Sequence, residues 1–427
     1  MDYEQLLLDE LVLALGCTEP IAIALAAAGA GQLLPEEPQT IDVHASGSII
    51  KNAYSVHVPH SGGRQGIPIS AALGALSKRP DRSLQVLEEV TPNILNKAVQ
   101  MVEEGKVRLH HQENVDNVYI RVDLQGQNHR SSAVVSGRHN RISFKSLDGQ
   151  ILKSLDEELK EQNNAENWNE VTLKGIYQWV NNLCFEERPR LKKLMEQEIQ
   201  TNLGIAKLGL SQPFGQEVGR TILEISEGDL IKEAIAHAAA GSDARMAGSD
   251  AAVTINAGSG NQGITVSVPI IYIAQKLGKS HDLLLRALTF SNLVGLYQKQ
   301  FIGKLSAYCG AVSAAAACVC GVAYLQNCDY ATIQMALSNT LGSVGGLVCD
   351  GAKGSCAKKI ASALADAFLS LDMAKKGLGF KAGDGVVGAN VDETVRNFGR
   401  IAYEGMVATD QTILNIMTQY ANEQTAN

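Results

Sequence analysis

Apolar side chains recur every three or four residues along most of this chain, which is the spacing of helices with a buried face. The leucines within residues 2–15 predict a first helix that stops at Gly16. Thr18 is the expected N-cap of a second helix, which tolerates Pro20 in its first turn. The expected helices cover residues 2–15, 18–34, 67–76, 93–104, 171–183, 190–203, 219–239, 282–297, 308–325, 330–342, 357–373 and 397–420.

Between about residue 39 and residue 153 the pattern alternates between apolar and polar positions, which predicts short strands. The first two strands are expected on either side of a Gly47-Ser48 turn. The expected strands cover residues 40–46, 53–58, 107–111, 118–124, 131–136 and 141–145. The predicted fold class is therefore α+β: a largely helical domain, residues 1–38 plus 154–427, carries an inserted smaller α+β domain, residues 39–153.

Composition narrows the possible partners. The formal net charge of −8 is spread over the chain without a basic patch, so nucleic acid is not an expected partner. Residues 305–328 are uncharged and long enough to span a bilayer, but small residues dominate them, which favours a buried helix and no membrane partner. The start is acidic and unlike an export signal. Eight cysteines in such a chain indicate reduced thiols and a cytoplasmic protein.

Most of the cysteines fit a structural role, because free cysteine behaves as a small apolar residue that is commonly buried. Cys184, Cys318, Cys320 and Cys328 are expected in the core.

Cys349 and Cys356 differ, because they flank a turn that contains Gly351 and Gly354. Such a turn can curl around an iron–sulfur cluster and offer backbone N–H groups to the cluster sulfurs. Inert core cysteines are an equal alternative on spacing alone, and a structural zinc site is a lesser one.

Cys17 is expected at or just before a helix N-terminus, where the helix dipole and free amides stabilise a thiolate. A thiol with a lowered pKa could act as a base, a nucleophile or a metal ligand. A buried turn residue is the structural alternative. Glu19 is interpreted only as a complement to the helix dipole.

A glycine-rich loop at residues 256–263 offers consecutive amides and polar side chains to an anion such as an amino-acid carboxylate. Such a loop also occurs in pyridoxal-phosphate lyases, but no lysine stands in a recognisable Schiff-base context. Arg245 is a candidate carboxylate fork or else part of a structural ion pair. Lys51 and Asn52 could likewise contact an anion or lie in a solvated turn. The substrate-binding candidates are Ser259, Gly260, Asn261, Gln262, Lys51, Asn52 and Arg245.

Three segments together, residues 16–20 (GCTEP), 258–263 (GSGNQG) and 349–356 (CDGAKGSC), resemble the L-cysteine desulfidase family. That family is related to the α chain of iron–sulfur L-serine dehydratases, and the similarity covers nearly the whole chain. The resemblance implies a [4Fe-4S] cluster held by Cys309, Cys349 and Cys356, and it implies Cys17 as the catalytic base. Related dehydratases close the open iron with a C-terminal cysteine. This sequence ends in Thr-Ala-Asn, so we expect water, substrate or Cys17 at that position.

The resulting hypothesis is an iron–sulfur lyase that removes the β-substituent of a small amino acid, converting L-cysteine into sulfide, ammonia and pyruvate. An L-serine dehydratase of the same mechanism, a pyridoxal-phosphate lyase and a non-enzymatic amino-acid-binding protein are the alternatives. The expected partner is a small amino-acid substrate, and a homodimer is a reasonable assembly. Sequence patterns leave open the choice between cysteine and serine and the role of the inserted domain.

Overall fold

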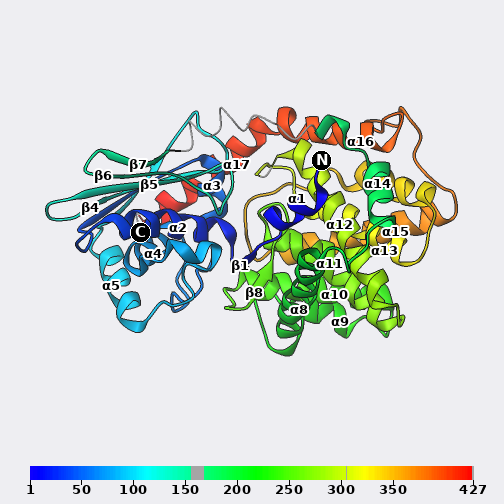
Figure 1. Cartoon of the computed structure of the whole chain (residues 1–427), viewed down its shortest axis with the longest axis horizontal. Coiled ribbons are helices and arrows are strands. Elements are labelled where there is room, and N and C mark those ends of the chain that lie inside the picture. The colour runs from blue at the N-terminus through cyan, green and yellow to red at the C-terminus, as the bar shows by residue number, and fades with distance from the viewer. Residues whose placement is uncertain (155–167, 304, 426–427) are drawn as a thin grey trace.

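The computed structural model describes residues 1–154, 168–303 and 305–425. Two lobes stand side by side in Figure 1, a sheet lobe with its covering helices and a larger helical lobe. The fold class predicted from the sequence, a mostly helical α+β protein, is confirmed. The division into domains stays a prediction, and its boundary at residues 153/154 adjoins residues 155–167, which lie outside the described part of the chain.

The sheet lobe is built on six strands in the order β3-β2-β4-β5-β6-β7. β2 and β3 pair in parallel, and the other neighbours pair antiparallel. The strands are β2 (Thr40–Ala45), β3 (Val107–His111), β4 (Tyr119–Gln125), β5 (Arg130–Ser136), β6 (Ile142–Leu147) and β7 (Gln150–Ser154). The helices of this lobe are α2 (Thr18–Leu33), α3 (Gly47–Ala53), α4 (Ile67–Ser77) and α5 (Pro92–Glu103).

α2 and α4 pack tightly against each other and against the sheet. Glycines allow this approach: a Cβ on Gly31 would lie 2.3 Å from the carbonyl oxygen of Ala75, and one on Gly74 would lie 2.1 Å from that of Ala24. α2 therefore packs with the sheet, although the sequence places it in the first segment of the helical domain.

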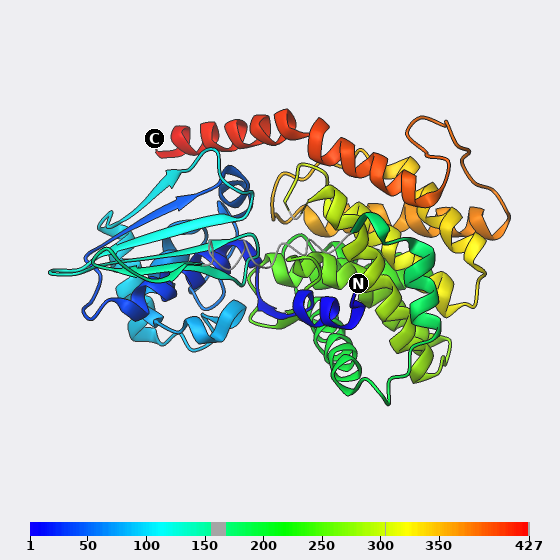
Figure 2. The same ribbon diagram turned by 45° about the horizontal axis from the view of Figure 1, so that its top comes forward.

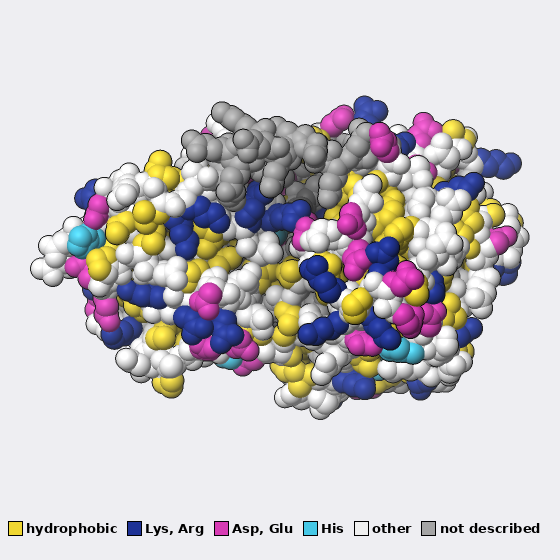
Figure 3. Space-filling model, in the orientation of Figure 1, with side chains coloured by type: hydrophobic (Ala, Val, Ile, Leu, Met, Phe, Trp, Pro, Cys, Tyr) yellow, Lys and Arg dark blue, Asp and Glu magenta, His cyan; other side chains and the backbone are white. Residues whose placement is uncertain are grey.

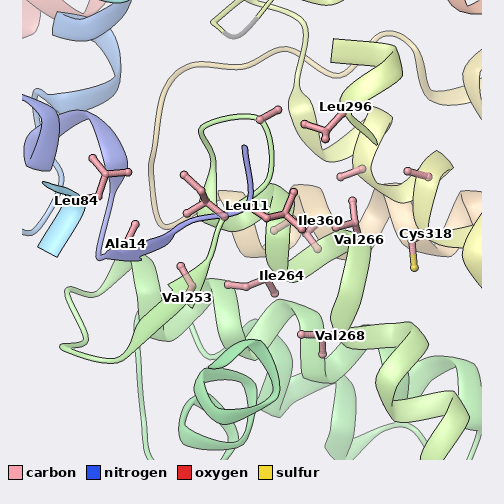
Figure 4. Close-up of a cluster of buried hydrophobic side chains, with 14 of the residues drawn as sticks. Leu11, Ala14, Leu84, Val253, Ile264, Val266, Val268, Leu296, Cys318 and Ile360 are labelled. Atoms are coloured by element: carbon pink, nitrogen blue, oxygen red, sulfur yellow. The ribbon is translucent and has the colours of Figure 1, made fainter. Parts of the chain in front are cut away.

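The helical lobe surrounds the apolar helices α11 and α13. Figure 4 shows part of its core, where Val266 and Ile264 of α11 lie near Leu11 and Ile360. The helices of this lobe are α1 (Tyr3–Glu10), α7 (Leu173–Asn181), α8 (Pro189–Ser211), α9 (Val218–Glu224), α10 (Leu230–Met246), α11 (Gly260–Lys276), α12 (His281–Ile302), α13 (Gly310–Leu325), α14 (Tyr330–Val344), α15 (Cys356–Lys375) and α16 (Val391–Arg400).

Cys318 and Cys320 are fully buried in α13, as predicted. The same prediction is wrong for Cys184 and Cys328, which are partly exposed because each follows the end of a helix. Among the described helices, none combines the length and hydropathy needed to cross a membrane.

Several predicted boundaries are wrong. The first helix ends at Glu10, and β1 (Leu13–Leu15) follows it and pairs antiparallel with β8 (Ala252–Thr254). Residues 53–58 are not a strand: helix α3, capped by Ser46, ends at Ala53, and the residues after it form a turn and one isolated bridge between His57 and Gln65. The helix expected over residues 219–239 is two helices, since Asp229 caps the start of α10.

The C-terminal segment links the two lobes. α16 is followed by a π-helical turn (Ile401–Gly405) and then by α17 (Val407–Thr425), where one helix over residues 397–420 was expected. α17 runs from the helical lobe across to the sheet lobe in Figure 2, where it contacts α3. On the face drawn in Figure 3, acidic and basic side chains are interspersed.

Candidate functional site

One cavity is lined by side chains from both lobes. The sheet lobe supplies Cys17 and Glu19 from the start of α2 and Asn52 from α3. The helical lobe supplies most of the other predicted site residues. Those in the cavity wall are Arg245, Ser259, Asn261, Gln262, Cys309, Cys349 and Cys356. Residues separated by more than three hundred positions in the sequence therefore meet at one place.

Two predicted residues lie directly behind this wall. Lys51 is almost fully buried; its ammonium donates to the backbone carbonyl of Cys349 over 3.3 Å and pairs with Asp410 of α17. Gly260 lies beneath Arg245, where a Cβ would come within 2.3 Å of the guanidinium Nε. Both residues thus support side chains or loops of the cavity.

Four long helices begin at the cavity. Cys17 is the N-cap of α2, Ser259 of α11 and Cys309 of α13, while Cys356 is the first residue of α15. The prediction that Thr18 is the N-cap is wrong by one residue. Because each helix N-terminus carries partial positive charge and unpaired amides, the cavity favours anionic groups.

Cys309 and Cys349 are held side by side by backbone pairing. The Cys309 amide donates to the Leu347 carbonyl at 3.0 Å, and the Cys349 amide donates to the Ala307 carbonyl at 2.7 Å. These two hydrogen bonds flank an antiparallel bridge between Tyr308 and Val348, the residues that directly precede the two cysteines. This long-range pairing brings together two cysteines that no local sequence pattern connects.

The thiols of this pair share a hydrogen bond. The Cys309 thiol donates to Cys349 and lowers the pKa of Cys349, and the nearby ammonium of Lys51 acts in the same direction. The pKa of Cys309 is raised in turn, first by this bond and then by burial. Burial also raises the pKa of Cys356, whose sulfur accepts the Lys353 amide at 3.4 Å. The hydrogen bond within the pair and the charge of Lys51 therefore both favour a thiolate at Cys349.

Cys309, Cys349 and Cys356 are the thiols of this cavity to be compared with an iron–sulfur site. In the described ranges, no group of three or more His, Cys, Asp or Glu side chains is arranged to hold a single metal ion. A cubane cluster instead distributes its thiolate ligands over separate irons, so they need not converge on a point. Cys309 and Cys356 lie at helix N-termini and Cys349 lies in the loop before α15, and all three line the same cavity, so they are the residues that would hold such a cluster.

Cys17 and Glu19 form a buried pair on the other wall. The Cys17 thiol donates to Oε2 of Glu19 at 2.9 Å, and Oε1 accepts from Asn52 at 3.2 Å. His139 of the sheet lobe lies 3.9 Å from Glu19 and helps to lower the pKa of that carboxyl, against the effect of burial.

The expected low pKa of Cys17 is wrong. Burial, and then the negative charge of Glu19, raise its pKa well above the ordinary value despite its place at a helix N-terminus. At rest, Cys17 is a thiol hydrogen-bonded to a carboxylate.

Arg245 is buried and presents two guanidinium nitrogens, Nε and Nη2, that have no hydrogen-bond partner among the described residues. Within the described residues no ion pair joins it to a carboxylate, and its charge helps to lower the pKa of Glu19. Three further buried polar atoms of the cavity wall also lack partners: Asn52 Oδ1, Asn261 Oδ1 and Tyr308 Oη. Since buried polar groups are normally satisfied, this pattern points to a polar ligand.

Sequence reasoning missed several residues of the wall. Glu19 was assigned to the helix dipole alone, and Lys299, Tyr308 and Lys359 were not singled out. For Lys359 a signal was available, because it follows Cys356 by three residues and so shares its helix face. Lys359 pairs with Asp350 and donates to the Val348 carbonyl at 3.0 Å, next to Cys349.

The chain resembles curated proteins along almost its entire length. A UPF0597 protein of Lachnoclostridium phytofermentans is 40% identical over 409 residues, covering 96% of this chain and 97% of its own. A UPF0597 protein of Finegoldia magna is 37% identical over 420 residues, covering 98% and 99%. These names specify no reaction. The sequence model for the serine dehydratase alpha chain matches residues 81–415. Because that match spans most of the chain, and the motifs around Cys17 and Cys349 indicated the same relationship, this protein belongs to the serine dehydratase alpha chain family.

Proposed function

We propose that this protein is a lyase that removes the β-substituent of a small L-amino acid, with a [4Fe-4S] cluster held by Cys309, Cys349 and Cys356. The observation that carries the proposal is the meeting of three thiols and an unpaired, buried guanidinium in one cavity. Family membership supports a serine dehydratase-like lyase. When bound, the cluster would supply an iron without a protein ligand, which acts as a Lewis acid toward the substrate.

The helical lobe binds the substrate carboxylate. Arg245 offers Nε and Nη2 from a buried position, and the two nitrogens of one guanidinium suit a bidentate contact with a carboxylate. Ser259 and the first amides of α11 lie in the same wall. Their position at the positive end of the helix favours the same anionic group.

Cys17 and Glu19 together remove the α-proton of the substrate. Glu19 accepts the thiol proton along the existing 2.9 Å hydrogen bond, and the Cys17 thiolate removes the proton from the substrate α-carbon. Loss of the β-substituent then leaves aminoacrylate, which water converts to pyruvate and ammonia. Positioned acid–base groups of this kind contribute about 10²- to 10⁴-fold to the rate.

L-Cysteine is the proposed substrate, with sulfide as the departing group, because the three motifs resemble the L-cysteine desulfidases. L-Serine is the alternative, and membership of the serine dehydratase alpha chain family favours it. The two substrates differ only in sulfur against oxygen at the β-position. The same assay therefore decides between them.

The test is anaerobic reconstitution with iron and sulfide, followed by pyruvate assays on L-cysteine and L-serine in parallel. We expect a brown protein that forms pyruvate, with a higher kcat/KM for L-cysteine. Cys349→Ser should lose the cluster and the activity, whereas Cys320→Ser, which alters a buried cysteine of the core, should retain both. Absence of iron and labile sulfide from carefully deoxygenated wild-type protein would refute the proposal, and a yellow protein bleached by borohydride would indicate pyridoxal phosphate instead.

The role of Cys17 is tested separately. Cys17→Ser should keep the visible absorbance of the cluster while kcat falls by about 10²-fold or more. Full turnover in this variant would remove Cys17 from the proton transfer.

A further inference from the structure

A row of buried amides leads from the cavity into the core of the helical lobe. Gln262 donates through Nε2 to Oδ1 of Asn256 at 2.8 Å, and Asn256 donates through Nδ2 to Oδ1 of Asn292 at 2.8 Å. Asn292 then donates to Oε2 of Glu198, also at 2.8 Å. Gln262 lines the cavity, and the other three side chains are fully buried.

Backbone carbonyls determine which way each amide points. Asn292 Nδ2 also donates to the Leu288 carbonyl at 3.0 Å, and Asn256 Nδ2 donates to the Asn292 carbonyl at 3.2 Å. A carbonyl oxygen only accepts hydrogen bonds, so the side-chain nitrogens of Asn256 and Asn292 must face these carbonyls. The side-chain oxygens of both residues therefore face toward Gln262. The Gln262 nitrogen therefore points to Asn256, and its oxygen points away from the row.

The free end of the row is a hydrogen-bond acceptor. Oε1 of Gln262 lies next to Gly310, where an added Cβ would be 3.3 Å from it, and Gly310 directly follows Cys309. In the part of the chain that the structure describes, no donor is bonded to this oxygen. An acceptor beside the thiols and in the same wall as Arg245 suits a ligand that brings its own N–H groups.

We propose that Gln262 accepts a hydrogen bond from the α-ammonium group of the substrate, and that Asn256 and Asn292 are positioning residues that hold its carbonyl oxygen toward the cavity. This inference rests on the proposed function and adds the group that recognises the amine. Arg245 then binds the carboxylate and Gln262 binds the ammonium group, so the site selects amino acids over small acids that lack an amine.

The inner end of the row is consistent with this role. Burial raises the pKa of Glu198 to about 8, so the row ends in an uncharged carboxylic acid at neutral pH. The row itself therefore carries no net charge. Its effect on the cavity comes from the fixed direction of the Gln262 amide dipole.

The experiment compares two unreactive ligands in the reconstituted protein by calorimetric titration under anaerobic conditions. L-Alanine has the carboxylate and the ammonium but no leaving group, and propionate is the same skeleton without the amine. We expect wild-type protein to bind L-alanine about 10- to 100-fold more tightly than propionate, as a hydrogen bond to a charged group allows. Gln262→Met, which removes the acceptor, should bring this ratio close to one.

Controls separate recognition from a structural role. Gln298→Met removes another fully buried amide, which donates to the Val294 and Ser313 carbonyls away from the cavity, and should leave the ratio unchanged. Asn256→Ala releases the Gln262 amide, so the ratio should move toward that of Gln262→Met. An unchanged ratio in Gln262→Met overturns the inference even if the protein converts L-cysteine to pyruvate. If the affinity ratios of L-alanine to propionate are as expected but no pyruvate forms from L-cysteine or L-serine, the result would instead count against the proposed reaction.

Discussion

The Glu198 carboxyl group is fully buried: Oε2 accepts a hydrogen bond from Asn292, and Oε1 has no partner in the part of the chain that the structure describes. Burial disfavours its charged form and raises its pKa from 4.5 to about 8. Between these two values the unfolded chain has released this proton and the folded protein has kept it. The stability that the neutral group contributes is therefore complete below pH 4.5 and is lost as the pH rises to about 8.

Glu198→Gln replaces the neutral acid with an uncharged group of the same shape. Relative to the variant, wild-type protein should lose about 1.4 kcal/mol of unfolding free energy for each pH unit between about pH 5.5 and about pH 7.5. Urea denaturation of both proteins at several pH values measures this difference. A difference that stays constant over that range would show that Glu198 is already ionised in the folded protein.

Individual site residues could be predicted from the sequence to the extent that their neighbours along the chain define them. The turn between Cys349 and Cys356 and the position of Cys17 before a helix are both local features, and the structure brings all three to the cavity. The pKa of Cys17 could not be predicted in this way. It depends on burial and on the charge of Glu19, and these outweigh the helix dipole.

At the scale of elements, one ion pair ties the C-terminal helix to the site. Asp410 of α17 pairs with Lys51 of α3 and accepts from Ser48 Oγ at 3.2 Å. The Lys51 side chain is 1% exposed and also contacts the carbonyl of Cys349. Asp410 is thus the link through which α17 supports both α3 and the loop that carries Cys349.

Asp410→Asn should lower the unfolding free energy by about 1–3 kcal/mol, because the buried Lys51 ammonium loses its charged acceptor. Denaturant titration of the cluster-free protein provides the measurement. Glu404→Gln is the matched control, since it breaks an exposed pair with Arg400 in the turn just before α17 and should cause no measurable change. Equal stability of Asp410→Asn and wild-type protein would mean that Lys51 is satisfied without α17.

Glycines explain why the sequence did not predict helix α11. Residues 256–263 were predicted as a loop because Gly258, Gly260 and Gly263 lie close together, yet of these glycines only Gly258 has a positive φ, +79°. Gly260 and Gly263 lie inside the helix, where a Cβ would be 2.3 Å from Arg245 Nε or 2.1 Å from the Thr254 carbonyl oxygen. Close packing, not chain reversal, requires them, and a single sequence does not distinguish these two uses of glycine.

At the scale of the whole molecule, neither lobe contains the site alone. The proposed cluster ligands and Arg245 belong to the helical lobe, while Cys17, Glu19 and Asn52 belong to the sheet lobe. The lobes are joined by the β1–β8 pair and by α17. The sequence predicted the two kinds of structure and the three motifs, but not that α2 packs on the sheet and carries Cys17 to the junction, because that depends on contacts between distant segments.

A site shared by two lobes should couple them. A ligand that binds only the folded junction stabilises every element that forms it, so reconstitution of the cluster should slow amide hydrogen exchange on both sides. We expect stronger protection at residues 17–21 of the sheet lobe as well as at residues 309–313 and 349–360 of the helical lobe. The β6–β7 hairpin lies at the far edge of the sheet and should exchange at the same rate with and without the cluster. Protection confined to the helical lobe would mean that Cys17 and Glu19 face the cavity without taking part in its closure, and the α-proton would then require an acceptor from the helical lobe.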